Sequence, residues 1–131
     1  MRDDRLYLSD MLEAVAQIQK YAAGGRDSLE REELVRTWIV YHIQVIGEAA
    51  QRLSKELRSA HPEVPWAQIA AMRNILIHAY FRIDLDEVWS VVSKDLPILK
   101  PQLEAMLAAL GPIGGLDDEE EATPKRSAIS P

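Results

Sequence analysis

The chain has 131 residues, of which 47% are hydrophobic, with no cysteine and a formal net charge of −6. That length allows one domain with a hydrophobic core but not two, and the lack of cysteine excludes disulfides and thiolate metal sites. The first residues mix charges without an apolar signal core, and no run approaches the roughly 18 apolar residues of a membrane span. We therefore expect a soluble, cytoplasmic protein that does not enter a membrane.

Apolar residues recur at helical spacing along most of the chain, and no strand-like alternation is flanked by hairpin signals. We expect a first helix over about residues 4–22, ended by Gly24 and Gly25. A capping-box pattern at 27–30 ("DSLE") predicts the start of a long second helix that ends near residue 59.

Three further helices are expected after the segment "HPEVP". Pro65 suits the first turn of a third helix, which extends to about residue 81. A second capping-box pattern at 84–87 ("DLDE") predicts a fourth helix, which Pro97 closes. In the fifth helix, Pro101 bends or delays the first turn. The predicted fold class is all-α: an antiparallel bundle of about five helices.

The predicted domain organisation is a helical bundle over residues 1–110 followed by a disordered acidic tail over residues 111–131. The run "DDEEE" concentrates charge in the tail, so the tail carries −3 and the bundle the other −3. A body this mildly acidic argues against tight, non-specific binding of nucleic acid through a basic face. It still allows a local phosphate site built from a few arginines.

The segment "MRNILIHAYF" places four polar side chains, Arg73, Asn74, His78 and Tyr80, in an otherwise apolar helix. Arginine offers a fixed fork of donors to phosphate oxygens, and histidine exchanges protons near neutral pH. Cleavage of a phosphate ester needs both abilities. Each residue also has a plainer interpretation: a salt-bridged surface arginine, a histidine at the edge of the core and a packed tyrosine.

Helical geometry does not bring all four side chains together. Because each residue advances about 100°, Asn74 and His78 share a face, whereas Arg73 and His78 diverge by about 140°. Either the helix bends near this segment, or Arg73 and His78 meet groups from a second subunit.

Other candidate residues are explained without catalysis. His42 lies in the long second helix, where we expect a packing or interface role, and His61 precedes a proline in a turn, where we expect exposure. Three scattered histidines do not form a zinc pattern, and helix capping explains the acidic cluster at 84–87. We therefore predict no metal site.

Several stretches, in order, resemble the HepT-like branch of the HEPN superfamily. "RNILIHAY" is a complete R-x4-H-x-Y motif. The stretches 45–57 ("VIGEAAQRLSKEL"), 61–74 ("HPEVPWAQIAAMRN") and 80–99 ("YFRIDLDEVWSVVSKDLPIL") resemble the family's second helix and the flanks of its motif. The resemblance covers roughly residues 4–108 and leaves the tail outside.

The resemblance implies an all-α, HEPN-like homodimer in which the two motifs face one cleft. Family members are toxins of two-gene, type VII-like toxin–antitoxin modules and act as metal-independent ribonucleases without a cofactor. Arg73 and His78 correspond to the catalytic pair. The partner is a small nucleotidyltransferase antitoxin, which uses ATP to transfer AMP onto the motif tyrosine, here Tyr80.

The expected reaction uses the 2′-hydroxyl of RNA as the nucleophile. His78 moves a proton and Arg73 stabilises charge on the phosphate oxygens. Asn74 either orients the imidazole or the phosphate, or is plain helix surface. AMP on Tyr80 adds bulk and negative charge where RNA must approach.

Two other readings stay open on the sequence. The chain can be a non-catalytic helical partner subunit of a nucleotidyltransferase, or a purely structural dimerisation module. A docking subunit tolerates His78→Ala, whereas a ribonuclease loses cleavage while remaining folded.

Overall fold

The computed structural model describes residues 3–74 and 84–112, and every regular element in these two ranges is helical. The all-α prediction is therefore confirmed. In chain order the elements are α1 (Asp4–Tyr21), the 3-10 turn η1 (Ala22–Gly24), α2 (Gly25–Arg31), α3 (Glu33–Arg52), α4 (Lys55–Ala60), α5 (Trp66–Ala70), α7 (Leu85–Ser90), the π-helical turn η2 (Val91–Asp95) and α8 (Leu96–Leu110).

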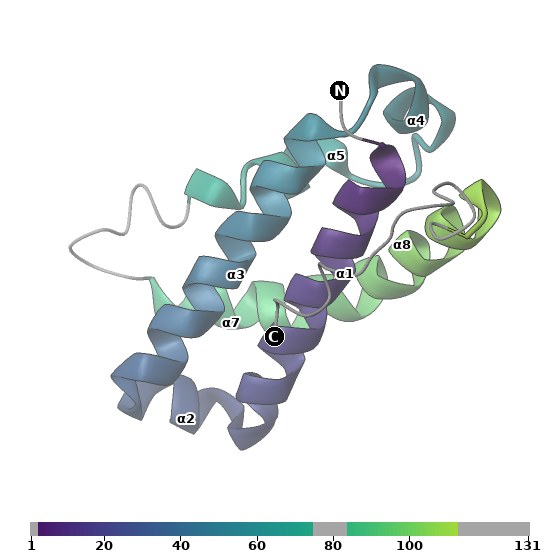
Figure 1. The fold of residues 1–131 in the computed structure, drawn as a ribbon. Helices are drawn as coiled ribbons and strands as arrows, with labels where there is room; N and C mark the ends of the chain where they lie inside the picture. The colour runs from purple at the N-terminus through teal and green to yellow at the C-terminus, as the bar shows by residue number, and fades with distance from the viewer. Residues whose placement is uncertain (1–2, 75–83, 113–131) are drawn as a thin grey trace.

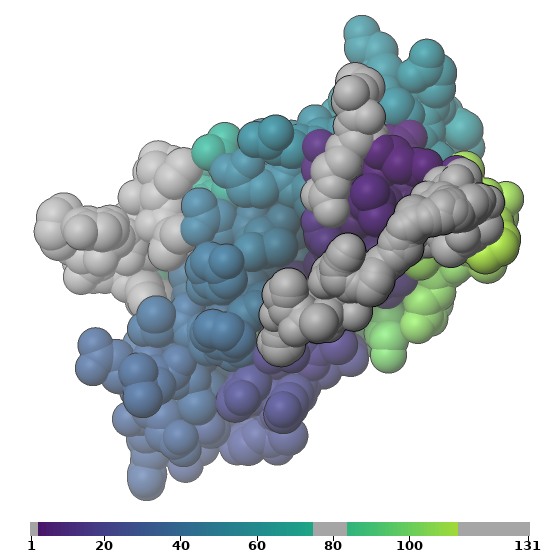
Figure 2. All heavy atoms as spheres, in the orientation of Figure 1, coloured from purple at the N-terminus to yellow at the C-terminus, as the bar shows by residue number. Residues whose placement is uncertain are grey.

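The long helices α1 and α3 lie side by side and antiparallel, and they share the face seen in Figure 2 (Figure 1). Asp3 begins α1, because its carboxylate accepts a hydrogen bond from the Arg5 N–H at 2.9 Å. At the other end of α1, the Trp38 indole of α3 donates to the Gln17 side chain at 3.2 Å. Because the two helices are antiparallel, the first turn of α1 lies next to the end of α3.

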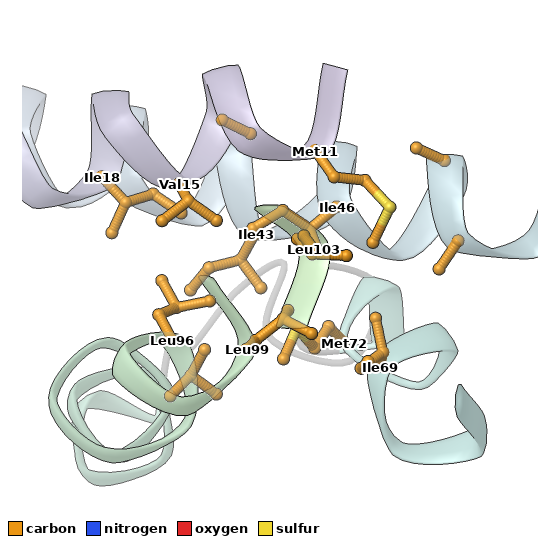
Figure 3. Close-up of a cluster of buried hydrophobic side chains, with 14 of the residues drawn as sticks. Met11, Val15, Ile18, Ile43, Ile46, Ile69, Met72, Leu96, Leu99 and Leu103 are labelled. Carbon is orange, nitrogen blue, oxygen red and sulfur yellow. The ribbon is translucent and has the colours of Figure 1, made fainter. Parts of the chain in front are cut away.

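Helix α8 packs against α1 in the opposite direction, which closes the antiparallel bundle. Arg5 Nη1 donates to the carbonyl of Leu110 at 3.1 Å, so the start of α1 meets the end of α8. The core lies where α1 and α3 face α5 and α8 (Figure 3). Its labelled apolar side chains are Met11, Val15, Ile18, Ile43, Ile46, Ile69, Met72, Leu96, Leu99 and Leu103.

The prediction of one long second helix was wrong, because the segment divides into α2, α3 and α4. Asp27 lies in the first turn of α2 rather than at its cap. Glu32 is extended (φ −108°, ψ 104°), and the Arg36 guanidinium donates to the carbonyls of Leu29 and Glu30 at the end of α2. These side-chain donors satisfy carbonyls that a continuous helix would bond internally.

The second break, between α3 and α4, is held by the start of α1. The Asp4 carboxylate accepts hydrogen bonds from the Ser54 N–H at 2.8 Å and from the Ser54 hydroxyl at 2.6 Å. The same hydroxyl accepts from the Leu57 N–H at 3.1 Å and so caps α4. A local cap and a distant carboxylate thus end α3 where helical periodicity continues.

The other predicted boundaries are partly confirmed. Helix α5 begins directly after Pro65 and ends at Ala70, and the rest of the predicted third helix beyond residue 74 lies outside the described residues. Asp84 caps α7 as expected, its side chain accepting from the Glu87 N–H. Pro97 does not close a helix, since α7, η2 and α8 form one helical run with the wide turn of η2 just before it.

The predicted tail and the domain boundary remain predictions, because residues 113–131 lie outside the described residues. Among the helices that the structure describes, none is long and apolar enough to cross a membrane.

Candidate active site

Arg73, the first residue of the R-x4-H-x-Y motif, follows α5 through a turn at residues 71–72. Helical backbone resumes at Arg73 and Asn74, whose N–H donates to the Ala71 carbonyl at 2.9 Å. Asn74 is exposed. His78 and Tyr80 lie outside the described residues, so the structure positions half of the predicted polar group.

The side chain of Arg73 is held by helix α3. Its Nη2 lies 3.1 Å from Oε2 of Glu48, and the two side chains are 35% and 38% exposed. The pair is therefore only partly screened by water, and it joins two segments that are distant in sequence. Glu48 lies one residue after a glycine that determines how closely these segments approach.

Gly47 allows α3 to lie directly against the backbone of the motif. A Cβ at this position would lie 2.9 Å from the Arg73 nitrogen and 3.3 Å from the Ala70 carbonyl oxygen. Backbone atoms cannot move aside as a flexible side chain can. Gly47 therefore keeps α3 close enough for Glu48 to contact Arg73.

The guanidinium of Arg73 retains donors beyond those used by Glu48. Among the described residues its Nε is buried without a hydrogen-bond acceptor. Arginine carries five N–H donors in a planar fork, and the closest approach of Glu48 is to the terminal nitrogen Nη2. Because Nε is buried, the terminal nitrogens of this partly exposed group are the ones that can hold the carboxylate and still offer N–H groups to an oxyanion.

Two hollows flank this region in the described structure. One, of about 340 Å³, runs between α1 and α3 and is lined by Glu48 together with Tyr41 and Arg52. The other, of about 530 Å³, lies between α5 and the α7–α8 run, where Glu87 and Asp95 contribute carboxylates to its wall. The first hollow offers an exposed aromatic ring and an arginine, together with the carboxylates of Asp10 and Glu48.

The two histidines that the structure describes, His42 and His61, make their contacts with residues other than Arg73. His42 is buried, donates from Nδ1 to the Trp38 carbonyl at 2.8 Å and packs edge-on against Trp38 and Tyr41, which confirms the predicted packing role. His61 is partly exposed and pairs with Glu63 at 3.2 Å. A backbone hydrogen bond and His61 together hold the pKa of the Glu63 carboxyl below its usual value.

No group of three or more acidic, histidine or cysteine side chains that can hold a metal ion occurs within the described ranges. The acidic caps at 84–87 serve helix α7, and Asp86 also pairs with Arg26 of α2.

The sequence of the chain matches a known protein-family model. The model described as ribonuclease HepT-like matches residues 11–106, which include Gly47, Glu48 and the whole R-x4-H-x-Y motif. The chain belongs to the HepT-like ribonuclease family. This confirms the resemblance to HepT-like HEPN proteins.

Curated relatives of this HepT-like chain carry ribonuclease names. "Probable ribonuclease HepT" of Thermococcus cleftensis is 31% identical over 106 residues, 80% of this chain and 96% of the relative. "Putative RNase MJ1380" of Methanocaldococcus jannaschii is 31% identical over 104 residues, 79% of this chain and 95% of the relative. "Gamma-glutamylcyclotransferase and putative RNase MJ0434" of the same organism is 34% identical over 110 residues, 83% of this chain but only 50% of the relative. No solved structure matches the chain.

Sequence reasoning did not assign a role to Gly47 or Glu48, although both lie in the stretch that resembles the second helix of HepT-like proteins. The signal was an isolated glycine inside a helical pattern, which often marks a close packing contact. Which segment it contacts is decided by the fold.

Proposed function

We propose that this HepT-like chain is the toxin of a type VII-like toxin–antitoxin module and cleaves RNA as a metal-independent endoribonuclease. The observation that carries the proposal is the position of Arg73. Within the region that the family model matches, its guanidinium lies partly exposed, held on one side by Glu48 and offering further N–H groups. A fixed guanidinium at a surface is what a reacting phosphate requires.

The proposed reaction needs no reagent beyond RNA itself. The 2′-oxygen attacks the adjacent phosphorus, the bond from phosphorus to the 5′-oxygen breaks, and the proton lost by the 2′-hydroxyl is balanced by one gained at the leaving 5′-oxygen. His78 performs one of these proton transfers, and Arg73 stabilises charge on the non-bridging oxygens. The products end in a 2′,3′-cyclic phosphate and a 5′-hydroxyl.

Tyr80 is the proposed control point. A nucleotidyltransferase antitoxin transfers AMP from ATP to its hydroxyl, which adds bulk and a negative phosphodiester beside the catalytic pair. Like charge and steric exclusion both oppose an approaching RNA phosphate. The proposal follows from the complete motif, in which Tyr80 stands two residues after His78.

We further propose that the active form is a homodimer in which both motifs face one cleft. In this arrangement each site can use residues of both subunits, although the directions of Arg73 and His78 differ by about 140° on a straight helix. Support comes from an exposed stripe on α3 formed by Leu34, Trp38 and Tyr41, which are 84%, 42% and 51% exposed. Their spacing of four and three residues is that of a helix-packing seam.

The test is cleavage of labelled RNA by the purified, unmodified protein in EDTA, beside Arg73→Ala and His78→Ala. Cleavage by the parent alone, with cyclic-phosphate ends and with DNA left intact, is the expected result. Circular dichroism checks that both variants fold. A parent that leaves all RNA intact, with a mass showing Tyr80 unmodified, contradicts catalysis and favours the non-catalytic partner subunit of a nucleotidyltransferase.

A further inference from the structure

We infer that Glu48 is a positioning residue of this ribonuclease, fixing the Arg73 guanidinium in the orientation that meets the reacting phosphate. The inference rests on the proposed function and adds a residue to it that lies outside the R-x4-H-x-Y motif. It begins from two neighbouring features of α3. Gly47 lies against the Arg73 backbone, and Glu48 contacts the Arg73 side chain.

The two contacts restrain Arg73 at both ends. The absence of a side chain on Gly47 sets the distance between α3 and the Arg73 nitrogen, while Oε2 of Glu48 lies 3.1 Å from Nη2. A free arginine side chain samples many rotamers, and confining it to one of them costs conformational entropy. Because Glu48 already confines the Arg73 side chain before the substrate binds, this entropy is not lost again during the reaction step.

Stability alone does not account for this pair. A partly exposed ion pair contributes little to the stability of the fold. The pair of Arg26 with Glu30 on α2 has comparable exposure, 40% and 44%, but joins residues one turn apart on one helix. Arg73 and Glu48 belong to different segments, as Arg26 and Asp86 also do, so their contact specifies the direction of the guanidinium relative to the whole bundle.

The geometry also distinguishes positioning from competition with the substrate. The closest contact of the carboxylate is with Nη2, at one end of the fork, whereas a phosphate commonly engages a two-donor edge of the fork. Glu48 also adds a negative charge near the site, which weakens general attraction of RNA. Removal of the Glu48 carboxylate is therefore expected to lower kcat, because a misplaced transition-state donor slows the chemical step. KM is expected either to stay the same or to fall.

The experiment measures kcat and KM on a short RNA for Glu48→Ala and Glu48→Gln, with Glu30→Ala as the matched control. Glu48→Ala is expected to lose about tenfold or more in kcat. Glu48→Gln keeps an oxygen that accepts from the guanidinium and is expected to recover most of that loss. Glu30→Ala, which removes the same charge from an equally exposed ion pair, is expected to match the parent.

A second readout follows Arg73 without relying on catalysis. NMR of the arginine side chains in ¹⁵N-labelled protein, assigned with Arg73→Ala, reports how freely the guanidinium rotates. Slow rotation in the parent and Glu48→Gln, and fast rotation in Glu48→Ala, is expected whether or not any RNA is cut. Loss of RNA cleavage in the parent thus counts against the proposed function alone.

Either of two results overturns the inference. One is a Glu48→Ala variant that cuts RNA as fast as the parent or faster, the faster case meaning that Glu48 competes with phosphate. The other is an Arg73 guanidinium that already rotates freely in the parent.

Discussion

Gly47 and Glu48 illustrate how two adjacent residues of α3 prepare a site to which neither was assigned from sequence. Gly47 acts by lacking a side chain, since a Cβ would meet the Arg73 nitrogen at 2.9 Å. Glu48 acts by its carboxylate, 3.1 Å from the guanidinium. The same pattern of helical residues would be ordinary surface if α3 faced solvent there.

Gly47→Ala is predicted to destabilise the protein by about 1–3 kcal/mol, because overpacking against backbone forces α3 and the motif apart. In an exposed helix the same change stabilises by roughly 1 kcal/mol, so the sign of the effect is diagnostic. Urea unfolding followed by circular dichroism measures it. Gln51→Ala, on the exposed side of the same helix, is the control and should stay within about 0.5 kcal/mol of the parent. A stabilising Gly47→Ala would contradict the close contact.

Tyr80→Phe is predicted to leave RNA cleavage intact while abolishing neutralisation by the antitoxin with ATP, because the acceptor hydroxyl is gone. Mass spectrometry for added AMP and an RNA cleavage assay after incubation with the antitoxin measure the two effects. Tyr21→Phe changes another exposed tyrosine, at the end of α1, and serves as the control. Continued AMP addition to Tyr80→Phe would place the modification elsewhere.

At the scale of elements, helix ends are decided by polar groups from other parts of the chain. Arg36 satisfies carbonyls at the end of α2, and Asp4 of α1 binds Ser54 between α3 and α4. Arg5 reaches from α1 to the last turn of α8. Periodicity cannot reveal these breaks, because the apolar spacing continues across them.

Asp4→Ala is predicted to cost about 1–3 kcal/mol of unfolding free energy, because the Ser54 N–H and hydroxyl lose their acceptor. Thermal or urea unfolding measures this change in the free energy of unfolding. Asp27→Ala removes an exposed ion pair with Arg31 and should change stability by less than about 1 kcal/mol. Equal losses of stability from the two substitutions would mean that the hydrogen bonds between Asp4 and Ser54 add no stability.

The start of α1 carries a predicted pH dependence. Hydrogen bonds from the Arg5 side chain and backbone hold the pKa of the Asp3 carboxyl below its usual 3.8. Since the folded pKa is below the unfolded one, this contribution is present above about pH 3.8 and is lost as the pH falls through the folded pKa. Asp3→Asn keeps a capping side chain but should be less stable at neutral pH by about 0.5–1 kcal/mol. Urea titrations from pH 7 downward should show this difference shrinking below about pH 4, and a constant difference would contradict it.

At the scale of the whole molecule, the bundle buries one core and leaves an apolar stripe uncovered. Leu34, Trp38 and Tyr41 line α3 beside the hollow that Glu48 borders. The proposed second subunit would cover this stripe, which lies on the helix that also positions Arg73.

Leu34→Glu is predicted to weaken self-association by about tenfold or more without unfolding the monomer, because it places a charge in the proposed interface from an exposed position. Analytical ultracentrifugation over a concentration series measures the dissociation constant. Ile98→Glu, at another exposed apolar position (64% against 84% for Leu34) on α8, is the control. Unchanged association of Leu34→Glu would place the interface elsewhere.

The sequence by itself determined the helical class, the first helix and the capped start of α7, because these depend on local spacing and local capping. It also determined family membership, since the motif and its flanks occur in order. Only the tertiary structure decided the breaks at Glu32 and Leu53, the continuity through Pro97 and the partnership of Glu48 with Arg73. The break at Leu53 and the partnership of Glu48 with Arg73 depend on atoms brought together from distant parts of the chain, and no local pattern encodes which distant atoms will meet.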